Sequence, residues 1–221
     1  DRIHWSYFGW FAGNTVLTLL AYPFIYFVEK AFGFLSDLRL MEMADTNNGL
    51  LRQLNEKAPG TFQHTLQVAN LAEEAARQIG ANPLLIRVGA LYHDIGKMNQ
   101  PHFFIENQSG VNPHDELEPA ESARVIINHV LDGIEMARKA KLHEDIIDFI
   151  RTHHGTSKVG YFFFKAKEDD PNAEGSLFTY PGPKPYSKET AILMMADAVE
   201  AASRSLQSYS EESLENLINK L

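Results

Sequence analysis

Five of the nine histidines in this chain, together with two aspartates, are candidate ligands for transition-metal ions. Imidazole nitrogens and carboxylate oxygens are ligands for divalent Mn, Fe, Co, Ni and Zn. One carboxylate can bridge two ions a few ångströms apart, and the aspartate of the His93-Asp94 pair suits that position. One ion that keeps a position open for water cannot use five histidines, so the set favours two ions. The candidate ligands are His64, His93, Asp94, His129, His153, His154 and Asp197.

Each of these residues, taken alone, also has an ordinary structural explanation. A His-Asp pair often arises by chance, and His129 lies among apolar residues where a core histidine is common. The His153-His154 pair could instead be favoured by the dipole at a helix C-terminus. Asp197 lies in the apolar segment 194–199, where a carboxylate is costly unless it is paired or coordinated. This last residue favours the metal hypothesis.

Helical patterns are expected to position these side chains. Pro59-Gly60 is expected to interrupt regular structure, and Thr61 can cap the helix that follows. Apolar residues at helical spacing continue from there to Gly80, which is expected to end the helix. Asn82-Pro83 has the order of an N-cap and a first helical residue, and opens a helix that ends near His93-Asp94. Further helices are expected over residues 119–140, 143–154, 187–206 and 210–221, whereas residues 159–164 suggest a strand.

Two long connections, residues 98–118 and 155–186, interrupt the helical pattern. Connections of that length are usually functional or disordered, so both are candidates for the walls of a site.

The N-terminal stretch has the composition of a membrane span. No Asp, Glu, Lys or Arg occurs between Ile3 and Val28, and a helix over residues 8–28 would cover roughly 30 Å. Pro23 and three polar residues interrupt the run, so a buried helix of a soluble protein is the alternative. Lys30 and Arg39 follow the stretch and favour a cytoplasmic C-terminal side. The sequence therefore predicts a transmembrane and juxtamembrane segment over residues 1–35 and a separate domain over residues 36–221.

Composition excludes several classes of protein. The chain has 221 residues, no cysteine, and 29 acidic against 20 basic residues, which gives a formal net charge of -9. Disulfides, thiolate zinc sites and cysteine nucleophiles are thereby excluded. An acidic chain also has no broad basic face for DNA or RNA, so any phosphate must be bound by a local device such as metal ions.

In combination, the motifs resemble those of the HD-domain metal-dependent phosphohydrolases. Several surrounding segments are similar to the membrane-anchored seven-transmembrane HD family of PgpH-type cyclic di-AMP phosphodiesterases, and the resemblance covers nearly the whole chain from about residue 30. The Gly-Tyr-Pro signature of the sister group that acts on cyclic di-GMP is replaced by other residues after His153-His154. The resemblance is carried by His64, the 92–97 run Tyr-His-Asp-Ile-Gly-Lys, His129, 153–155, Asp197, and the segments 58–64, 80–84, 106–108, 112–115 and 196–202.

This resemblance implies an all-α HD-domain helical bundle with a dinuclear metal site, preceded by a transmembrane or juxtamembrane helix. Lys97 would bind a non-bridging phosphate oxygen and, with Asp94, would be catalytic, whereas a solvated lysine at a helix end is the alternative. Glu200 could orient a ligand histidine or be surface charge, and the aromatic run 161–164 could stack an adenine or serve as a docking or core element. One divalent ion, Mn²⁺ or Fe²⁺, would be held by His64, His93, Asp94 and Asp197, and the second by Asp94, His129, His153 and His154.

The expected function is the hydrolysis of cyclic di-AMP to linear pApA by a hydroxide that bridges the two ions. The N-terminal helix would be the last span of a multi-pass protein of the cell inner membrane, with the HD domain in the cytoplasm. The alternatives are a phosphohydrolase for another nucleotide and a membrane-tethered sensor that binds a cyclic nucleotide without cleaving it. No DNA or RNA partner is expected, and a homodimer is left open.

Overall fold

The computed structural model describes residues 5–47 and 49–220, and within these ranges the chain is all-α. The regular elements there are α-helices and short 3-10 helices, and an isolated antiparallel bridge joins Lys158 to Thr179. The expected all-α class is confirmed. The chain divides into two compact units, the first ending at Leu40 and the second beginning at Met41.

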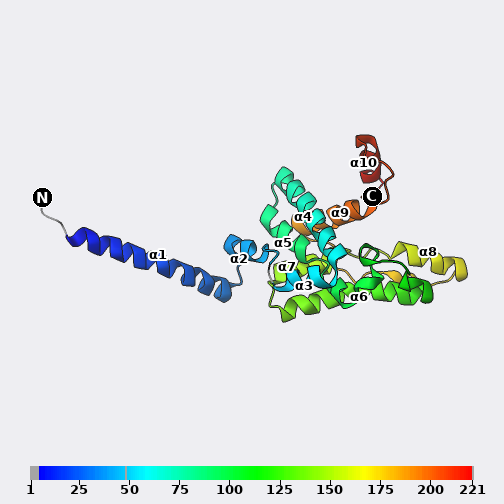
Figure 1. The fold of residues 1–221 in the computed structure, drawn as a ribbon, viewed down its shortest axis with the longest axis horizontal. Coiled ribbons are helices and arrows are strands. Elements are labelled where there is room, and N and C mark those ends of the chain that lie inside the picture. The colour runs from blue at the N-terminus through cyan, green and yellow to red at the C-terminus, as the bar shows by residue number, and fades with distance from the viewer. Residues whose placement is uncertain (1–4, 48, 221) are drawn as a thin grey trace. The chain divides into compact units, whose positions relative to one another are not determined.

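The elements follow one another in chain order (Figure 1). Of the helices expected from the sequence, each is present with its ends shifted by a few residues. Residue 221, the end of the last expected helix, lies outside the described residues. The α-helices are α1 Trp5–Phe32, α2 Asp37–Met43, α3 Gly49–Lys57, α4 Pro59–Ile79, α5 Pro83–Tyr92, α6 Pro119–Lys139, α7 Glu144–Thr152, α8 Gly160–Asp169, α9 Lys188–Ser203 and α10 Glu211–Ile218. The 3-10 helices are η1 Ile95–Asn99, η2 Pro101–Phe103, η3 Ile105–Asn107, η4 Pro113–Glu116 and η5 Gly175–Phe178.

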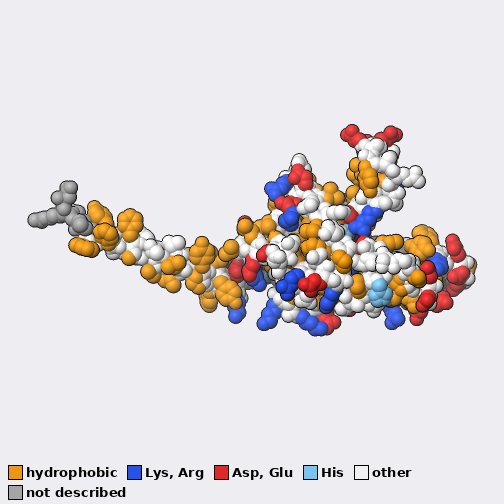
Figure 2. Space-filling model, viewed as in Figure 1, with side chains coloured by type: hydrophobic (Ala, Val, Ile, Leu, Met, Phe, Trp, Pro, Cys, Tyr) orange, Lys and Arg blue, Asp and Glu red, His pale blue; other side chains and the backbone are white. Residues whose placement is uncertain are grey.

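The first unit consists mainly of α1, a helix long and apolar enough to cross a membrane. Its best 18-residue window has a mean hydropathy of 1.5, and none of that window is buried. Side chains along α1 are hydrophobic or uncharged over most of its length (Figure 2). The hydroxyls of Thr15 and Thr18 donate to the carbonyls of Phe11 and Asn14, each at 2.9 Å. Two polar groups that interrupt the apolar run are therefore satisfied within the helix, as a membrane interior requires.

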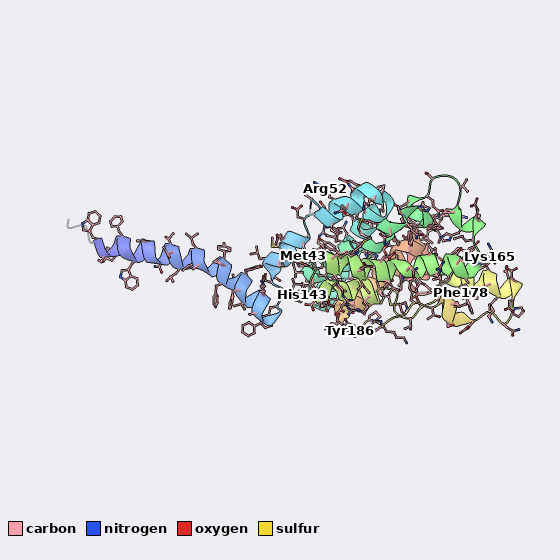
Figure 3. All side chains as sticks on the ribbon, turned by 90° about the horizontal axis from the view of Figure 1, so that it is seen from below. Met43, Arg52, His143, Lys165, Phe178 and Tyr186 are labelled. Atoms are coloured by element: carbon pink, nitrogen blue, oxygen red, sulfur yellow. The ribbon has the colours of Figure 1, made fainter. Side chains whose placement is uncertain are left out.

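The second unit is a helical bundle. Helices α4 and α5 pack against each other, α9 lies against both, and α7 contacts α5 and α9. Helix α6 packs on η1, α7 and α8. Lys165 of α8 and Phe178 of η5 lie at one end of the bundle, away from His143 and Tyr186 (Figure 3). The long connections 98–118 and 155–186 are thus not structureless, since they contain η1 to η4 and α8 with η5 respectively.

Local signals explain most helix ends. Asn82 caps α5, because its side chain accepts hydrogen bonds from the backbone N–H groups of Leu84 and Leu85. Gly80 ends α4 in the left-handed conformation at φ 66°, where glycine has no steric penalty.

Two local predictions are wrong. Helix α4 begins at Pro59, not after Thr61, so Thr61 lies inside the first turn and its side chain is used elsewhere. Residues 159–164 are not a strand, because α8 starts at Gly160. Phe162, four residues before Ala166 in α8, is buried in a cluster with Ala123 and Phe178, and Ala166 packs against this cluster, so the burial favours the helical period.

Two glycines let the helices that carry the candidate ligands approach closely. A Cβ atom at Gly89 of α5 would lie 2.3 Å from the Phe149 ring of α7. A Cβ atom at Gly96 of η1 would lie 1.9 Å from the carbonyl oxygen of His129 in α6. Backbone contact between η1 and α6 therefore sets the distance between Asp94 and His129.

We expect Gly96→Ala to lower the free energy of unfolding by about 1–3 kcal/mol, because the methyl group overlaps the backbone of α6, which cannot move aside as a side chain could. Urea denaturation measures this change. Gly160→Ala is the matched control, since its nearest neighbour, the Phe164 ring, would lie 3.8 Å from the new Cβ atom. Equal stability of the two variants would contradict the close approach of η1 and α6.

Candidate metal centre

The predicted ligands converge in the interior of the second unit. His64 comes from α4, His93 and Asp94 follow α5, and His129 lies in α6. His153 and His154 follow α7, and Asp197 comes from α9. Three overlapping groups have ligand atoms that all lie within 4.8 Å of one another: His129, His153 and His154; His64, His93 and Asp94; and His93, His153 and Asp197.

The carboxylate of Asp94 lies at the middle of the cluster, with its two oxygens facing different histidines. Oδ2 lies 3.5 Å from His64 Nε2 and 3.3 Å from His93 Nε2. Oδ1 lies 3.3 Å from His129 Nε2 and 3.5 Å from His153 Nε2. Each oxygen therefore faces one pair of imidazoles, which is the arrangement that a bridging carboxylate needs.

Asp197 closes the side of the cluster nearest Oδ2 of Asp94. Its Oδ1 lies 2.9 Å from His64 Nε2 and 3.6 Å from His93 Nε2. On the opposite side, the rings of His153 and His154 lie 4.0 Å apart between centroids. The donors near Oδ2 of Asp94 thus differ from those near Oδ1, while His93, His153 and Asp197 also lie within 4.8 Å of one another.

Backbone carbonyls orient three of the histidines. The Nδ1 atoms of His93, His129 and His153 each lie within hydrogen-bond distance of the carbonyl three residues earlier. A carbonyl oxygen only accepts, so each Nδ1 carries a proton and each Nε2 points into the cluster. This is the tautomer that binds metal through Nε2.

The resulting geometry suits a cation. His129 Nε2 and His153 Nε2 lie 3.2 Å apart, so a proton or a metal ion is needed between the two nitrogens. His93 Nε2 and Asp94 Oδ1 are buried and lack a hydrogen-bond partner among the described residues. Buried polar atoms of this kind are rare unless an ion or water completes them. The donor set therefore fits divalent metal ions.

The pKa shifts in the cluster also indicate that its two carboxylates attract positive charge. Burial raises the pKa of Asp94, but the charges of Lys97 and His93 outweigh it and hold the pKa well below its usual range. Burial lowers the pKa of His93, yet Asp94 and Asp197 outweigh it and raise that pKa to about 10. In His154, burial and the neighbouring His153 hold the pKa well below its usual range. Two ionised carboxylates that draw protons onto the imidazoles would equally attract a metal cation.

Lys97 lies beside the cluster and is held between two carboxylates. Its Nζ lies 2.7 Å from Asp94 Oδ2 and 2.9 Å from Glu106 Oε1. Burial lowers the pKa of Lys97, but these two carboxylates outweigh it and raise the pKa above its usual value. The ammonium group therefore stays charged at the edge of the candidate metal site.

Glu106 is a residue whose role the sequence did not suggest. Its Oε1 also accepts a hydrogen bond of 2.9 Å from Thr61 Oγ1, and Asn107 Oδ1 accepts one of 3.1 Å from the Thr61 backbone. Gly60 permits this contact, because a Cβ atom there would lie 1.8 Å from the Glu106 carbonyl oxygen. Residues 59–61 and 106–107 lie far apart in the sequence, but their hydrogen bonds together hold the carboxylate of Glu106 against Lys97.

Tyr180 was also missed, because only the fold brings it to the site. Its ring stacks on His154 at 4.2 Å between centroids, with 28° between the planes. Burial raises the pKa of Tyr180, so the phenol is neutral at physiological pH.

Glu200 is buried and paired, not surface charge. Its Oε2 lies 2.6 Å from His64 Nδ1, and its Oε1 accepts hydrogen bonds from Arg204 at 2.8 and 3.0 Å. Because the carboxylate accepts the Nδ1 proton, it turns Nε2 of His64 toward Asp197. His93, His129 and His153 obtain the same orientation from backbone carbonyls.

We expect Glu200→Gln to weaken divalent-metal binding by about 10- to 100-fold, because an amide is a poorer acceptor for the His64 proton and does not raise the basicity of the ring. Calorimetric titration of chelator-treated protein with Mn²⁺ measures the affinity. Glu168→Gln, at an exposed position of α8, is the control. Unchanged affinity in Glu200→Gln would show that Glu200 does not orient a ligand.

Comparison with known proteins identifies the domain. A model of the HD domain matches residues 61–202, which include every candidate ligand. The chain therefore belongs to the HD-domain family. A buried cluster of histidine and aspartate in an HD domain is consistent with divalent-metal binding.

Two curated relatives of this HD domain have the same name. The cyclic-di-AMP phosphodiesterase PgpH of Bacillus subtilis is 48% identical over 206 residues, covering 93% of this chain and 29% of the relative. The protein of that name from Listeria monocytogenes is 47% identical over 196 residues, covering 88% and 27%. The chain spans less than a third of the length of these relatives.

A solved structure is similar as well. The HD domain of L. monocytogenes PgpH in complex with cyclic-di-AMP has a TM-score of 0.75 and 46% identity to this HD domain, over 77% of this chain and 79% of that one.

Proposed function

We propose that this HD domain is the catalytic part of a phosphodiesterase that hydrolyses cyclic di-AMP to linear pApA. The observation that carries the proposal is the position of Asp94, whose two oxygens face two separate sets of histidines. The close PgpH relatives and the complex of one of their HD domains with cyclic-di-AMP support the choice of substrate.

The residues that would hold the metal ions form two sets. His64, His93, Asp94 and Asp197 would bind one ion, and Asp94, His129, His153 and His154 the other. Mn²⁺ or Fe²⁺ is the proposed metal, since both accept mixed nitrogen and oxygen donors. Bound at this site, two divalent ions supply an acidified water and neutralise phosphate charge.

The chain itself would position the phosphodiester. Lys97 has its ammonium group 2.7 Å from Asp94 Oδ2 and would donate to a non-bridging phosphate oxygen as negative charge builds there. Glu106 and Thr61 fix the lysine, so little reorganisation is needed during the reaction. The neutral phenol ring of Tyr180 covers His154 and would limit access of bulk water to that side of the site.

We further propose that α1 is the last membrane span of a multi-pass inner-membrane protein, with the HD domain in the cytoplasm. The length and hydropathy of α1 and the internal hydrogen bonds of its threonines support a membrane span, and Lys30 and Arg39 after it favour a cytoplasmic HD domain. The acidic charge of the chain supports the absence of a DNA or RNA partner.

Turnover of a nucleotide panel by the Mn²⁺-loaded protein tests the function. We expect release of pApA from cyclic di-AMP and slower reaction with cyclic di-GMP, nucleoside monophosphates, deoxynucleoside triphosphates and alarmones. Fast hydrolysis of one of the other nucleotides, without cleavage of cyclic di-AMP, would establish the alternative phosphohydrolase. Binding of cyclic di-AMP by the metal-loaded protein without product would establish a sensor.

A further inference from the structure

The five candidate histidine ligands differ in how their rings are held. In four of them, a hydrogen bond to Nδ1 turns Nε2 toward the cluster. The acceptors are backbone carbonyls for His93, His129 and His153, and the Glu200 carboxylate for His64. Among the described residues, no hydrogen bond reaches a ring nitrogen of His154, whose contacts are with other rings. A different interaction must therefore orient this ligand.

Tyr180 supplies the ring that stacks on His154. The two centroids lie 4.2 Å apart with 28° between the planes, and the centroid of His153 lies 4.0 Å from that of His154. We propose that Tyr180 is the positioning residue for His154, and that its ring sets the affinity of the ion held by His129, His153 and His154. The inference rests on the two-ion centre of the proposed function and adds a residue that controls one of the two ions.

Stacking can take the place of the missing hydrogen bond. A ligand ring that is free to rotate loses conformational entropy when it binds a metal, and a ring that is already held does not. If the imidazole of His154 rotated out of its plane, its edge would meet the face of Tyr180, so the contact fixes that plane. The ring of Tyr180 also meets His129, at 6.1 Å between centroids and 81° between planes. One side chain thus contacts two of the three histidines in this group.

The backbone holds Tyr180 in this position. Its N–H donates to the carbonyl of Ser157 at 2.9 Å, and the N–H of Ser157 donates to the carbonyl of His154 at 3.0 Å. The antiparallel bridge between Lys158 and Thr179 lies next to these hydrogen bonds. Tyr180 is also buried, with 7% of its surface exposed. Two backbone hydrogen bonds therefore connect the tyrosine to the histidine on which it stacks.

The two oxygens of Asp94 face histidines that are oriented by different residues. Glu200 orients His64, whose Nε2 lies 3.5 Å from Oδ2 of Asp94. Tyr180 contacts His129, whose Nε2 lies 3.3 Å from Oδ1. Loss of the Tyr180 ring should therefore weaken the binding of one ion and leave the other ion in place.

Calorimetric titration of chelator-treated protein with Mn²⁺ tests this role, because it measures both binding steps without any nucleotide. Tyr180→Leu keeps an apolar side chain but has no planar ring. It should weaken one step by roughly 10- to 100-fold, which is the usual effect of losing a residue that orients a ligand. Tyr180→Phe keeps the ring and should bind both ions as the wild type does. Tyr209→Ala removes a ring that is 69% exposed, and is the control.

A double variant shows which ion depends on Tyr180. Glu200→Gln acts through His64, so Glu200→Gln combined with Tyr180→Leu should weaken both binding steps, whereas each single variant leaves one step unchanged. If the double variant keeps one step at the wild-type affinity, both residues support the same ion and the inference is wrong. Unchanged affinities in Tyr180→Leu, loss of both steps in that variant, or a loss that Tyr180→Phe does not restore would also contradict it.

Failure of the proposed function would give a different result. Wild-type protein that binds two Mn²⁺ ions but does not cleave cyclic di-AMP would refute the phosphodiesterase and leave the role of Tyr180 to be decided by the titrations of its variants. Wild-type protein that binds fewer than two ions would refute both proposals.

Discussion

Asp94→Asn is expected to abolish hydrolysis of cyclic di-AMP and to remove most of the bound metal. Asparagine keeps the volume of the side chain but replaces one charged oxygen with an amide nitrogen, which cannot bind a cation. Because Oδ1 and Oδ2 face different histidine pairs, either orientation of the amide disrupts one set. Metal ions contribute several kcal/mol to transition states of this type, so the loss should be on the order of a thousandfold or more.

Metal analysis of the purified variant, together with turnover of cyclic di-AMP, measures both effects. Asp169→Asn, at the exposed end of α8, is the matched control and should retain metal and activity. Circular dichroism shows whether the variant is folded, because a buried change can unfold a domain. Full occupancy of two ions per folded Asp94→Asn chain would contradict the bridging role.

The sequence was sufficient for the parts of the fold that depend on local signals. Asn82 before Pro83 and Gly80 after α4 mark helix ends through hydrogen bonds and φ angles that involve only adjacent residues. Among the seven candidate ligands, Asp197 was suggested by its apolar segment, whereas the histidines and Asp94 became candidates only when taken together. Their meeting in one cluster depends on where α4 to α7 and α9 pack, which the order of the motifs indicates only through a family resemblance.

Features that depend on long-range contact were not predictable. Thr61 was expected to cap a helix because nothing nearby shows that Glu106 and Asn107 would be its partners. Tyr180 reaches His154 only because the second long connection folds back along the site. Residues 159–164 were expected to form a strand because an aromatic run fits either period until Phe178 provides a surface for one face.

Lys97→Ala is expected to retain both metal ions and to lower kcat by about 100- to 1000-fold. Its ammonium group is not a proposed ligand, but it is the cation nearest to Asp94 Oδ2, at 2.7 Å. In other enzymes, removal of one preorganised group that stabilises developing negative charge lowers kcat by about the same factor. Metal content and kcat, measured on the same preparation, separate this effect from that of Asp94→Asn, in which both fall together.

Two further variants define what Lys97 contributes. Lys139→Ala removes an exposed lysine that is paired with Glu135 at 2.6 Å, and should change neither metal content nor kcat. Lys97→Arg keeps the charge but replaces a compact ammonium with a larger planar group between Asp94 and Glu106, so it should recover only part of the rate. A Lys97→Ala variant that has lost its metal would show that the lysine supports the cluster. One that keeps both metal and full kcat would show that phosphate charge is stabilised by the metal ions alone.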